Sequence, residues 1–349
     1  MVGLVEHDGR AMMARVTLAD VAAVVGVSAK TVSNVVNGTG GVSDDMRARI
    51  LAAIRELDYR PNLAARQLRG GSSGLLALAV PDLREPYFAE FAAQFVATAQ
   101  ERRQTVLIAQ TGGDRAAEMA FAEAEGMPAL DGLVLSPLSI TKADLEERRS
   151  RTPMVVVGEH GRAVVPAGIT HVGIDNVAAA HAATDYLISR GRTRIAAVGV
   201  QHEGSTATSR QRFVGYRQAL AGAGIPLLEP LLCPVGPFNR AEGSRAVDAL
   251  IERGAAFDAL MCFNDTLALG ALYSLGAHGV AVPRDVDVIG FDDIEEGRFS
   301  IPPFATVDSG VEAASRMILD LLAAPAELPG GHHEVPFRLM RCEGERIRA

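Results

Sequence analysis

The chain has 349 residues, too many for one ordinary hydrophobic core, so two or three domains are expected. Its composition, 48% hydrophobic and 22% charged, is that of a globular protein, and no apolar run reaches the roughly eighteen residues that a membrane-spanning helix needs. The net charge of −8 disfavours nucleic acid as a partner of the chain as a whole, and three widely spaced cysteines exclude a disulfide framework and favour a reducing, cytoplasmic compartment.

The distribution of charge changes this first interpretation. Residues 15–73 hold eight Lys/Arg and five Asp/Glu, a net charge of +3, whereas residues 74–349 carry a net charge of −10. A small basic unit joined to a large acidic one predicts an anionic partner for the small unit. Residues 1–14 lack the basic start and the continuous apolar run of a signal peptide, and we expect them to form a disordered tail.

Residues 15–60 are predicted to form a helix-turn-helix domain. Thr17 is a good N-cap for a first helix with apolar residues at helical spacing, and Gly26 ends that helix and permits a sharp turn. Ser28 can then cap a second helix that runs to about residue 37. One side of that helix is a stripe of valines, and its other side is small or polar: Ala29, Lys30, Ser33, Asn34 and Asn37. Two helices joined by a glycine turn, the second with a polar outer face, are typical of DNA-reading domains.

A third helix is predicted after Ser43, with two aspartates near its positively polarised start. Its inner face is expected to comprise Ile50, Leu51, Ile54 and Leu57. The pattern by itself leaves one alternative open, a plain three-helix bundle with a polar face that is only solvated.

The stretch 61–73, "PNLAARQLRGGSS", is predicted to form a short alanine-rich helix followed by a flexible linker. A helix this short does not persist alone in water. We therefore expect it to fold against a partner, either a second copy of the chain or DNA.

Residues 16–74 resemble the DNA-binding head of the lac repressor (LacI/GalR) family of bacterial transcriptional regulators. The resemblance rests on "TLADVAAVVGVSAKTVSNVVN" and "VSDDMRARILAAIRELDYRPNLAARQL", which follow the family's order and spacing. It implies that the helix at 29–37 enters the major groove and that residues 61–69 form a hinge helix, which pairs with its dimer mate in the minor groove and wedges Leu68 between base pairs. The residues implied to contact DNA are Thr17, Ser28, Ala29, Lys30, Thr31, Ser33, Asn34, Asn37, Asn62, Ala65 and Leu68. Asn34 stands where the family usually has arginine, so the preferred operator bases are expected to differ.

The body, residues 74–349, is predicted to be α/β. Short apolar runs alternate with amphipathic stretches, a pattern typical of parallel sheets that are covered on both faces. The runs fall into two series, separated near residues 171–175, which predicts two Rossmann-like lobes with a ligand between them. We assign residues 74–172 plus about 305–325 to the first lobe and 173–304 plus about 326–349 to the second. The expected strands are 75–80, 105–110, 130–136, 154–158, 194–200, 231–235, 259–264 and 286–293.

Enzymatic and metal-dependent functions find little support in the sequence. It contains no G-x-x-x-x-G-K-[ST], no G-x-S-x-G and no G-x-G-x-x-G after a strand. The pair His332–His333 beside Glu334 is interpreted as a solvated part of a Gly/Pro-rich loop rather than as a metal site. No catalytic residue, cofactor or metal is therefore expected.

The body also resembles the family's effector-binding core, which is itself similar to periplasmic sugar-binding proteins. Matching pieces include "VPDLREPYFAEF", "VGIDN", "SRQRFVGYRQAL", "CFNDTLALGAL" and "VIGFDDIEEGRFSIPPFATV". The residues implied to contact the effector are Tyr87, Phe88, Asp175, Arg210, Arg212, Asn264, Asp265 and Asp292. Planar donors, carboxylates and aromatic faces of this kind suit a sugar.

Together, head and body predict a cytoplasmic, homodimeric repressor that binds operator DNA, does not associate with a membrane and changes its DNA affinity when a sugar binds between the lobes. Three alternatives stay open: a repressor that needs a purine-type corepressor, a solute-binding receptor and an enzyme.

Overall fold

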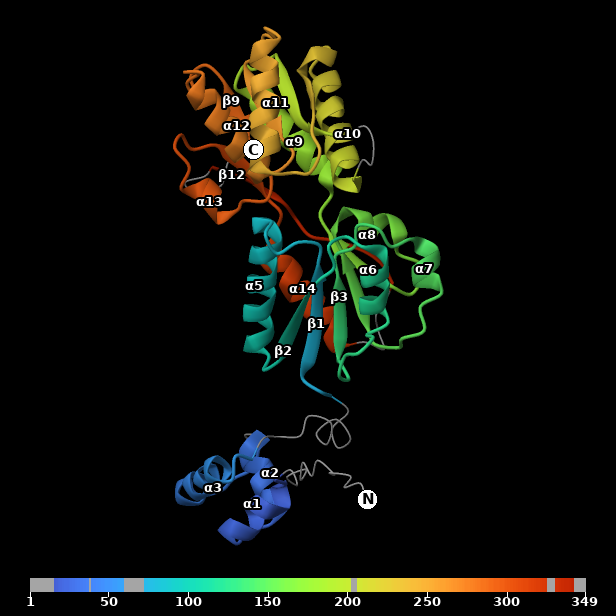
Figure 1. Cartoon of the computed structure of the whole chain (residues 1–349), viewed down its shortest axis with the longest axis vertical. Coiled ribbons are helices and arrows are strands. Elements are labelled where there is room, and N and C mark those ends of the chain that lie inside the picture. The colour runs from blue at the N-terminus through green and yellow to red at the C-terminus, as the bar shows by residue number, and fades with distance from the viewer. Residues whose placement is uncertain (1–15, 38, 60–71, 202–205, 325–329, 342–349) are drawn as a thin grey trace, which may run out of the picture. The chain divides into compact units, whose positions relative to one another are not determined.

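The computed structural model describes residues 16–37, 39–59, 72–201, 206–324 and 330–341. Contacts divide the chain into two compact units, residues 1–73 and 74–349, which are described separately. The first unit contains three helices, α1 (Leu18–Val25), α2 (Ala29–Asn37) and α3 (Asp44–Glu56) (Figure 1). The expected tail at 1–14 and hinge helix at 61–69 lie outside the described residues.

The three helices of the first unit share one small apolar core. Its buried members include Val21, Val25, Val32, Val35 and Ile50. The prediction for α3 was wrong at Leu51, which is 39% exposed, and Ala53 is buried instead. Residues 50, 53, 54 and 57 follow helical spacing, whereas residue 51 is turned about 100° away from residue 50.

Local interactions fix both ends of α1. The Thr17 hydroxyl accepts a hydrogen bond from the Asp20 N–H, and the Asp20 carboxylate accepts one in return from the Thr17 N–H, which makes a capping box. Gly26 has φ of 75°, a left-handed conformation that glycine adopts without strain and that ends α1. No single described helix is long and apolar enough to cross a membrane; α1 and α2 satisfy that test only as a pair bent by 107°.

The second unit contains two six-stranded sheets. The first has the order β11-β5-β4-β3-β1-β2 and the second the order β12-β10-β9-β8-β6-β7. The pairs are parallel except β10 with β12, which is antiparallel. The strands of the first sheet are β1 (Leu75–Val80), β2 (Thr105–Gln110), β3 (Gly132–Leu135), β4 (Met154–Val157), β5 (Thr170–Gly173) and β11 (Gly331–Glu334). Those of the second are β6 (Ile195–Val200), β7 (Leu232–Pro234), β8 (Ala259–Cys262), β9 (Asp287–Ile289), β10 (Ala305–Asp308) and β12 (Arg338–Arg341).

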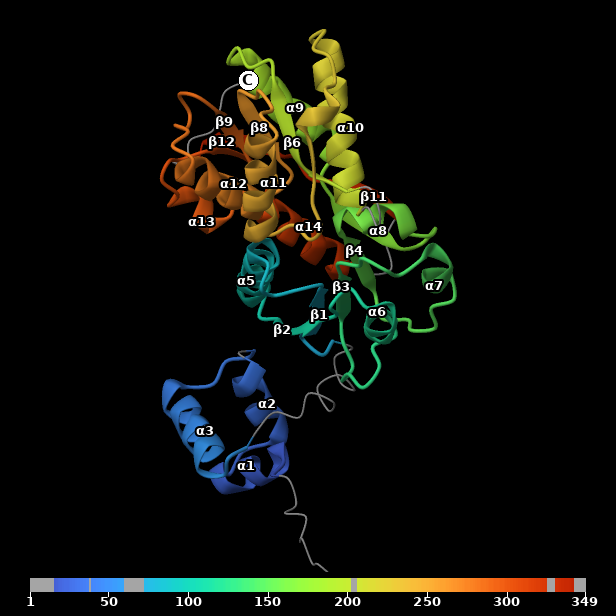
Figure 2. The ribbon, with the colours of Figure 1, turned by 45° about the horizontal axis from the view of Figure 1, so that its top comes forward.

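Helices cover both faces of the first sheet because successive residues of its central strands point to opposite sides. Leu76 and Leu78 of β1 join the core formed with Phe91 and Phe95 of α5, whereas Leu75 of β1 belongs to a separate core that contains residues of α6 and α7. Figure 2 shows α5 and α14 on one side of this sheet and α6, α7 and α8 on the other. The helices of this lobe are α5 (Pro86–Glu101), α6 (Arg115–Ala122), α7 (Lys142–Glu146), α8 (Gly158–Val164) and α14 (Val311–Ala323).

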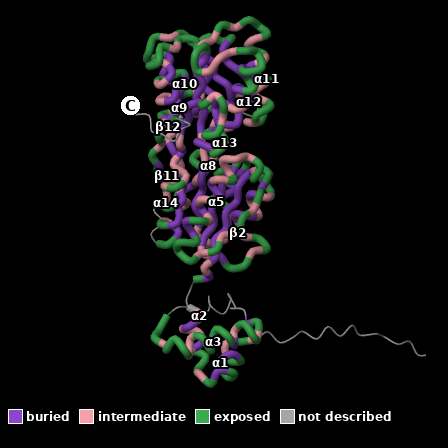
Figure 3. The backbone as a smooth tube through the Cα atoms, turned by 90° about the vertical axis from the view of Figure 1, so that its left-hand side faces the viewer, coloured by how far each residue is buried: buried purple, intermediate pink, exposed green. Residues whose placement is uncertain are grey.

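The second lobe repeats this arrangement. Its helix α9 packs beside α10, and α11 packs beside α12. The strands between these helix pairs form the buried interior of the lobe (Figure 3). Its helices are α9 (Asn176–Ser189), α10 (Ala207–Gly222), α11 (Arg240–Glu252), α12 (Asp265–Ala277), α13 (Glu295–Arg298) and the 3-10 turn Glu229–Leu231.

The described chain passes between the lobes at residues 174–175, 309–310 and 335–337, and this corrects the expected lobe boundaries. β10, expected in the first lobe, pairs with β9 and β12 of the second. β11, expected in the second lobe, pairs with β5 of the first. Strand pairing is a contact between distant segments, so these short strands carry no local signal of the sheet that they join.

Candidate functional site

The outer face of α2 exposes the small and basic residues that the sequence predicts for DNA reading. Ala29 and Lys30 are exposed, and Ser33 and Asn34 are partly exposed. The side chain of Asn34 lies against Gly40, where an added Cβ would be 3.0 Å from its Nδ2 atom. The Asn37 side chain, and Asn62, Ala65 and Leu68, lie outside the described residues.

Three hydroxyl residues expected at the DNA surface also hold the first unit together. Thr17 caps α1, as described above, and is exposed. Ser28 Oγ accepts a hydrogen bond of 3.1 Å from the Thr31 N–H and lies 2.8 Å from the Thr31 hydroxyl. These residues therefore fix the starts of α1 and α2, and free N–H groups at a helix start can approach a phosphate.

Arg212 of α10 is the centre of the candidate effector site in the second unit. It is 4% exposed, and its guanidinium stacks on the Phe291 ring with 3.5 Å between Cζ and the ring centre. Its Nε donates to Asn176 Oδ1 at 2.8 Å, and its NH1 donates to the Phe263 carbonyl. Its NH2 faces Asp292 Oδ1 at 3.5 Å. The expected residues Arg212 and Asp292 thus lie together.

Asp292 and Asp293 form a strained turn after β9. Their φ angles are 109° and 55°, values in the left-handed half of conformational space that non-glycine residues rarely adopt. Burial raises the pKa of Asp292 well above its usual value, and the nearby Arg212 charge opposes this rise. The strain and the cost of burial indicate that neighbouring residues hold this carboxylate beside Arg212.

Asp265 is one of the residues that hold the turn. Its carboxylate accepts hydrogen bonds from the Thr306 hydroxyl at 2.7 Å and from the Ile294 N–H at 3.0 Å, and it is 1% exposed. A Cβ on Gly290 would lie 2.0 Å from Asp265 Oδ1, so this approach requires glycine. Burial raises the pKa of Asp265 to about 8. Expected as an effector contact, Asp265 lies in the structure beneath the turn that carries Asp292.

Asn264, the residue before Asp265, connects the lobes. Its Oδ1 caps α12 by accepting the Leu267 N–H at 2.9 Å, and its Nδ2 donates to Glu85 Oε1 of the first lobe at 3.3 Å. Thr266 donates to the same oxygen at 3.2 Å. Burial raises the pKa of Glu85 to about 7.

A second glutamate from the first lobe also reaches the second. Glu159 of α8 accepts a hydrogen bond of 2.8 Å from the Thr208 hydroxyl and one of 2.9 Å from Asn176 Nδ2. Its Oε1 lies 3.6 Å from Arg212 NH2. Sequence reasoning missed Glu159, although it follows the carboxyl end of β4, the edge where ligands of parallel sheets bind.

Sequence reasoning also missed Asn176, because it assigned the effector contact to the neighbouring residue Asp175. Asp175 caps α9, and its Oδ1 accepts the Val177 and Ala178 N–H groups at 2.9 and 3.0 Å. Asn176, the first residue of α9, instead turns toward Arg212 and Glu159. The expected effector contact Asp175 is therefore the helix cap, and the amide beside it lines the cavity.

The other expected contacts separate into inward and outward residues. Tyr87 lines the cavity, and burial raises the pKa of its hydroxyl. The nearby carboxylates of Glu159 and Asp292 raise this pKa further. Phe88 packs against Tyr87 edge-on, with ring centres 5.3 Å apart, and against the hydrophobic core. Arg210 is exposed on α10, on a different face from Arg212.

The cavity between these residues is small. It encloses about 40 Å³ and is lined by Tyr87, Glu159, Asn176, Arg212 and Ser309 among others. This volume is below the roughly 300–1,000 Å³ typical of sites for drug-sized ligands. A larger, open groove of about 860 Å³ lies between α5, α14 and the turn at 292–299, and it meets the cavity at Val311. We place the site in the cavity because Arg212, Asn176 and Glu159 line it, whereas Asp292 lines the larger groove beside it.

The histidines interpreted as a solvated loop lie instead on strand β11. His332 Nδ1 is 2.7 Å from Nδ1 of His171 on β5, and His171 Nε2 is 2.7 Å from the Gly158 carbonyl. Burial lowers the pKa of His171 to about 4, so its ring is neutral near pH 7. Among the described residues, no group of three or more His, Cys, Asp or Glu side chains could hold a metal ion.

Comparison with known proteins covers both units. A model of the bacterial regulatory proteins of the lacI family matches residues 17–62, and a model of the periplasmic binding protein-like domain matches residues 184–342. The transcriptional repressor CytR of Escherichia coli is 31% identical over 328 residues, which cover 94% of each chain. The transcriptional regulator DegA of Bacillus subtilis is 32% identical over 297 residues, 84% of this chain and 86% of that one.

Solved structures agree with these matches. The CelR–cellobiose complex covers 95% of this chain and 100% of its own, with 30% identity and a TM-score of 0.65. The lac repressor dimer bound to operator and the anti-inducer ONPF covers 95% and 98%, with 24% identity and a TM-score of 0.77, and shares the fold. Regulators of this kind are not enzymes. The chain belongs to the lacI family of bacterial DNA-binding transcriptional regulators and carries a periplasmic-binding-protein-like effector domain.

Proposed function

We propose that this protein is a cytoplasmic, homodimeric repressor that binds a near-palindromic operator and changes its DNA affinity when a sugar binds between its lobes. The observation that carries the proposal is the cluster around Arg212, which brings donors and carboxylates of both lobes together beside the cavity. A ligand in that cavity contacts both lobes at once, so its binding energy can alter their relative position.

In the proposed DNA complex, each α2 lies in the major groove. Lys30 reaches a base edge, with the small residue Ala29 beside it, and Asn34 suits adenine rather than guanine. Ser28, Thr31, Ser33, Asn37 and Thr17 position the helix on the backbone. The hinge residues Asn62, Ala65 and Leu68 enter the minor groove, where Leu68 opens a base step.

A sugar fits the proposed site because the cavity combines an aromatic side chain, Tyr87, with amide, guanidinium and carboxylate groups. The related CelR structure is a complex with cellobiose, which supports this ligand class. The proposed contacts are Arg212, Asp292 and Tyr87 directly, with Asn264, Asp265, Phe88, Asp175 and Arg210 around them.

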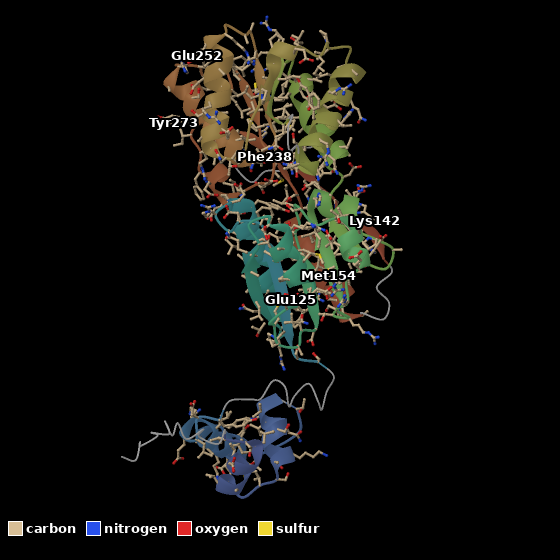
Figure 4. All side chains as sticks on the ribbon, turned by 45° about the vertical axis from the view of Figure 1, so that its right-hand side comes forward. Glu125, Lys142, Met154, Phe238, Glu252 and Tyr273 are labelled. Atoms are coloured by element: carbon tan, nitrogen blue, oxygen red, sulfur yellow. The ribbon has the colours of Figure 1, made fainter. Side chains whose placement is uncertain are left out.

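The proposed dimer explains three large apolar side chains on the surface of the second lobe. Tyr273, Phe299 and Ile301 are 75%, 77% and 96% exposed. Figure 4 shows Tyr273 projecting from the outside of this lobe. We propose that these side chains contribute to the dimer contact, because burial of apolar surface favours protein association.

Selection of genomic DNA fragments by the purified full-length protein, followed by footprinting with and without a sugar panel, tests the proposal. A protected near-palindrome that is released by a sugar is the expected result. Protection that appears only with an added purine would replace the proposed inducer by a corepressor. Failure to select any DNA sequence would contradict the regulatory role.

A further inference from the structure

The proposed effector site surrounds one buried arginine with carboxylates. We infer that the effector is uncharged or cationic, and that Glu159 excludes phosphorylated and carboxylated ligands from Arg212. This inference rests on the proposed function and adds the chemical class that the site accepts.

The guanidinium of Arg212 is already occupied by acceptors of the chain itself. Its Nε and NH1 donate to Asn176 and to the Phe263 carbonyl, and its NH2 faces both Asp292 and Glu159, at 3.5 and 3.6 Å. One face of its plane is covered by Phe291. An anionic ligand could reach the arginine only by displacing Glu159 while remaining close to Asp292.

No second buried cation compensates for these carboxylates among the described residues that line the cavity. Arg162 lines it but has an exposed side chain. His171 also lines it and is neutral, because burial lowers its pKa to about 4. Among these lining residues Arg212 is thus the buried cation, and it faces the carboxyl groups of Glu159 and Asp292.

Hydroxyl and ammonium groups suit the same geometry. Glu159 and Asp292 accept hydrogen bonds, and a neutral polyol can donate to both without introducing charge repulsion. The Thr208 hydroxyl already makes this kind of contact with Glu159 at 2.8 Å. A ligand hydroxyl that replaces Thr208 would keep the carboxylate satisfied as the lobes move.

The test is a titration of the full-length protein with inorganic phosphate at constant ionic strength, followed by phosphorus NMR. Glu159→Gln preserves size and one hydrogen-bond acceptor but removes the charge. It is expected to bind phosphate at least about tenfold more tightly than the wild type, because one unit charge a few ångströms from the anion is removed. Glucose and glucose 6-phosphate, compared on the wild type, should show no preference for the phosphorylated sugar.

Glu252→Gln is the matched control, since Glu252 is exposed at the end of α11 (Figure 4). Equal phosphate affinity in Glu159→Gln, Glu252→Gln and the wild type overturns the inference. Tight binding to the wild type that disappears in Arg212→Gln also overturns it. If Glu159→Gln melts at a lower temperature than the control, Glu159→Ala takes its place. The same preparations are also tested for selection of genomic DNA. Loss of DNA selection would contradict the proposed function, whereas unchanged phosphate affinity would contradict the inference about Glu159.

Discussion

Glu85, at the start of α5 in the first lobe, accepts a hydrogen bond of 3.2 Å from the hydroxyl of Thr266 on α12 in the second lobe. Asn264 donates to the same oxygen. Glu159, on another segment of the first lobe, accepts a hydrogen bond from Thr208 of the second lobe. Two carboxylates of the first lobe therefore contact the second. A regulator that changes the position of its lobes must break and remake these contacts.

Glu85 is expected to make the stability of the protein depend on pH. Its pKa rises from 4.5 to about 7 on folding, so the folded protein binds more protons than the unfolded chain between these values. This contribution to stability is complete below about pH 4.5 and is lost as the pH rises to about 7. Glu85→Gln, which mimics the protonated form, should flatten the dependence by up to about 2–3 kcal/mol. Urea unfolding at several pH values measures this, and an unchanged slope in the variant would contradict it.

Asp265 is expected to act on ligand binding through the turn that carries Asp292. Asp265→Ala leaves the Ile294 N–H and the Thr306 hydroxyl without their acceptors and should cost roughly 2–4 kcal/mol of stability. Asp265→Asn keeps one acceptor and one donor in place, so it should cost less and retain effector binding. Denaturant unfolding and calorimetry on both variants check this. If both variants lose stability and binding equally, the two hydrogen bonds do not position Asp292.

Lys30 is expected to read a base. Lys30→Ala should weaken binding to the selected operator by roughly 1–3 kcal/mol and relax the preference at one base position. Lys142→Ala removes an equivalent charge from the exposed start of α7 in the body and serves as the control. Gel-shift titrations with operator and random DNA separate the possibilities: an equal loss on both would make Lys30 a phosphate contact.

The two arginines of α10 are expected to differ in effector binding. Arg212 is buried against Phe291, Asn176 and Asp292, whereas Arg210 is exposed. Asp292→Asn and Arg212→Lys should abolish the response of DNA binding to the effector and leave operator affinity without effector intact. Arg210→Ala should reduce the response less. Calorimetry with the sugar that releases the operator in the footprinting panel is decisive, and normal affinity in Asp292→Asn would remove that residue from the site.

Ile301 is expected to contribute to self-association. Its side chain is 96% exposed, and placing a charge there should oppose burial against a second copy. Ile301→Asp should shift sedimentation toward the monomer at concentrations where the wild type is dimeric. Leu138→Asp changes an exposed leucine of the first lobe in the same way and should leave the dimer intact. Equal sedimentation of Ile301→Asp and the wild type would locate the dimer contact elsewhere.

The sequence by itself determined the class of the protein and most of its elements. The capping pair Thr17 and Asp20, the turn at Gly26 and the apolar strand runs are local signals, because each depends on residues a few positions apart. The family pattern in the head was also readable, and the comparisons confirm the family. Arg212 and Asp292 were found through the resemblance of the body to the family's effector-binding core, and they lie side by side.

Only the tertiary structure decided which distant segments meet. β11 joins the first sheet by pairing with β5, which lies more than a hundred residues earlier in the chain. β10 joins the second sheet by pairing with β9 and β12. Glu85 and Glu159 have no local pattern that marks them as contacts of Thr266 and Thr208, because those contacts join segments that are far apart in the sequence. Asp265 was identified as a cleft residue by sequence, but its position under the strained turn follows from the packing of α12 against β10 and Gly290. Sequence thus determined the parts and their chemistry, and the long-range packing of the lobes decided which charges share one cavity.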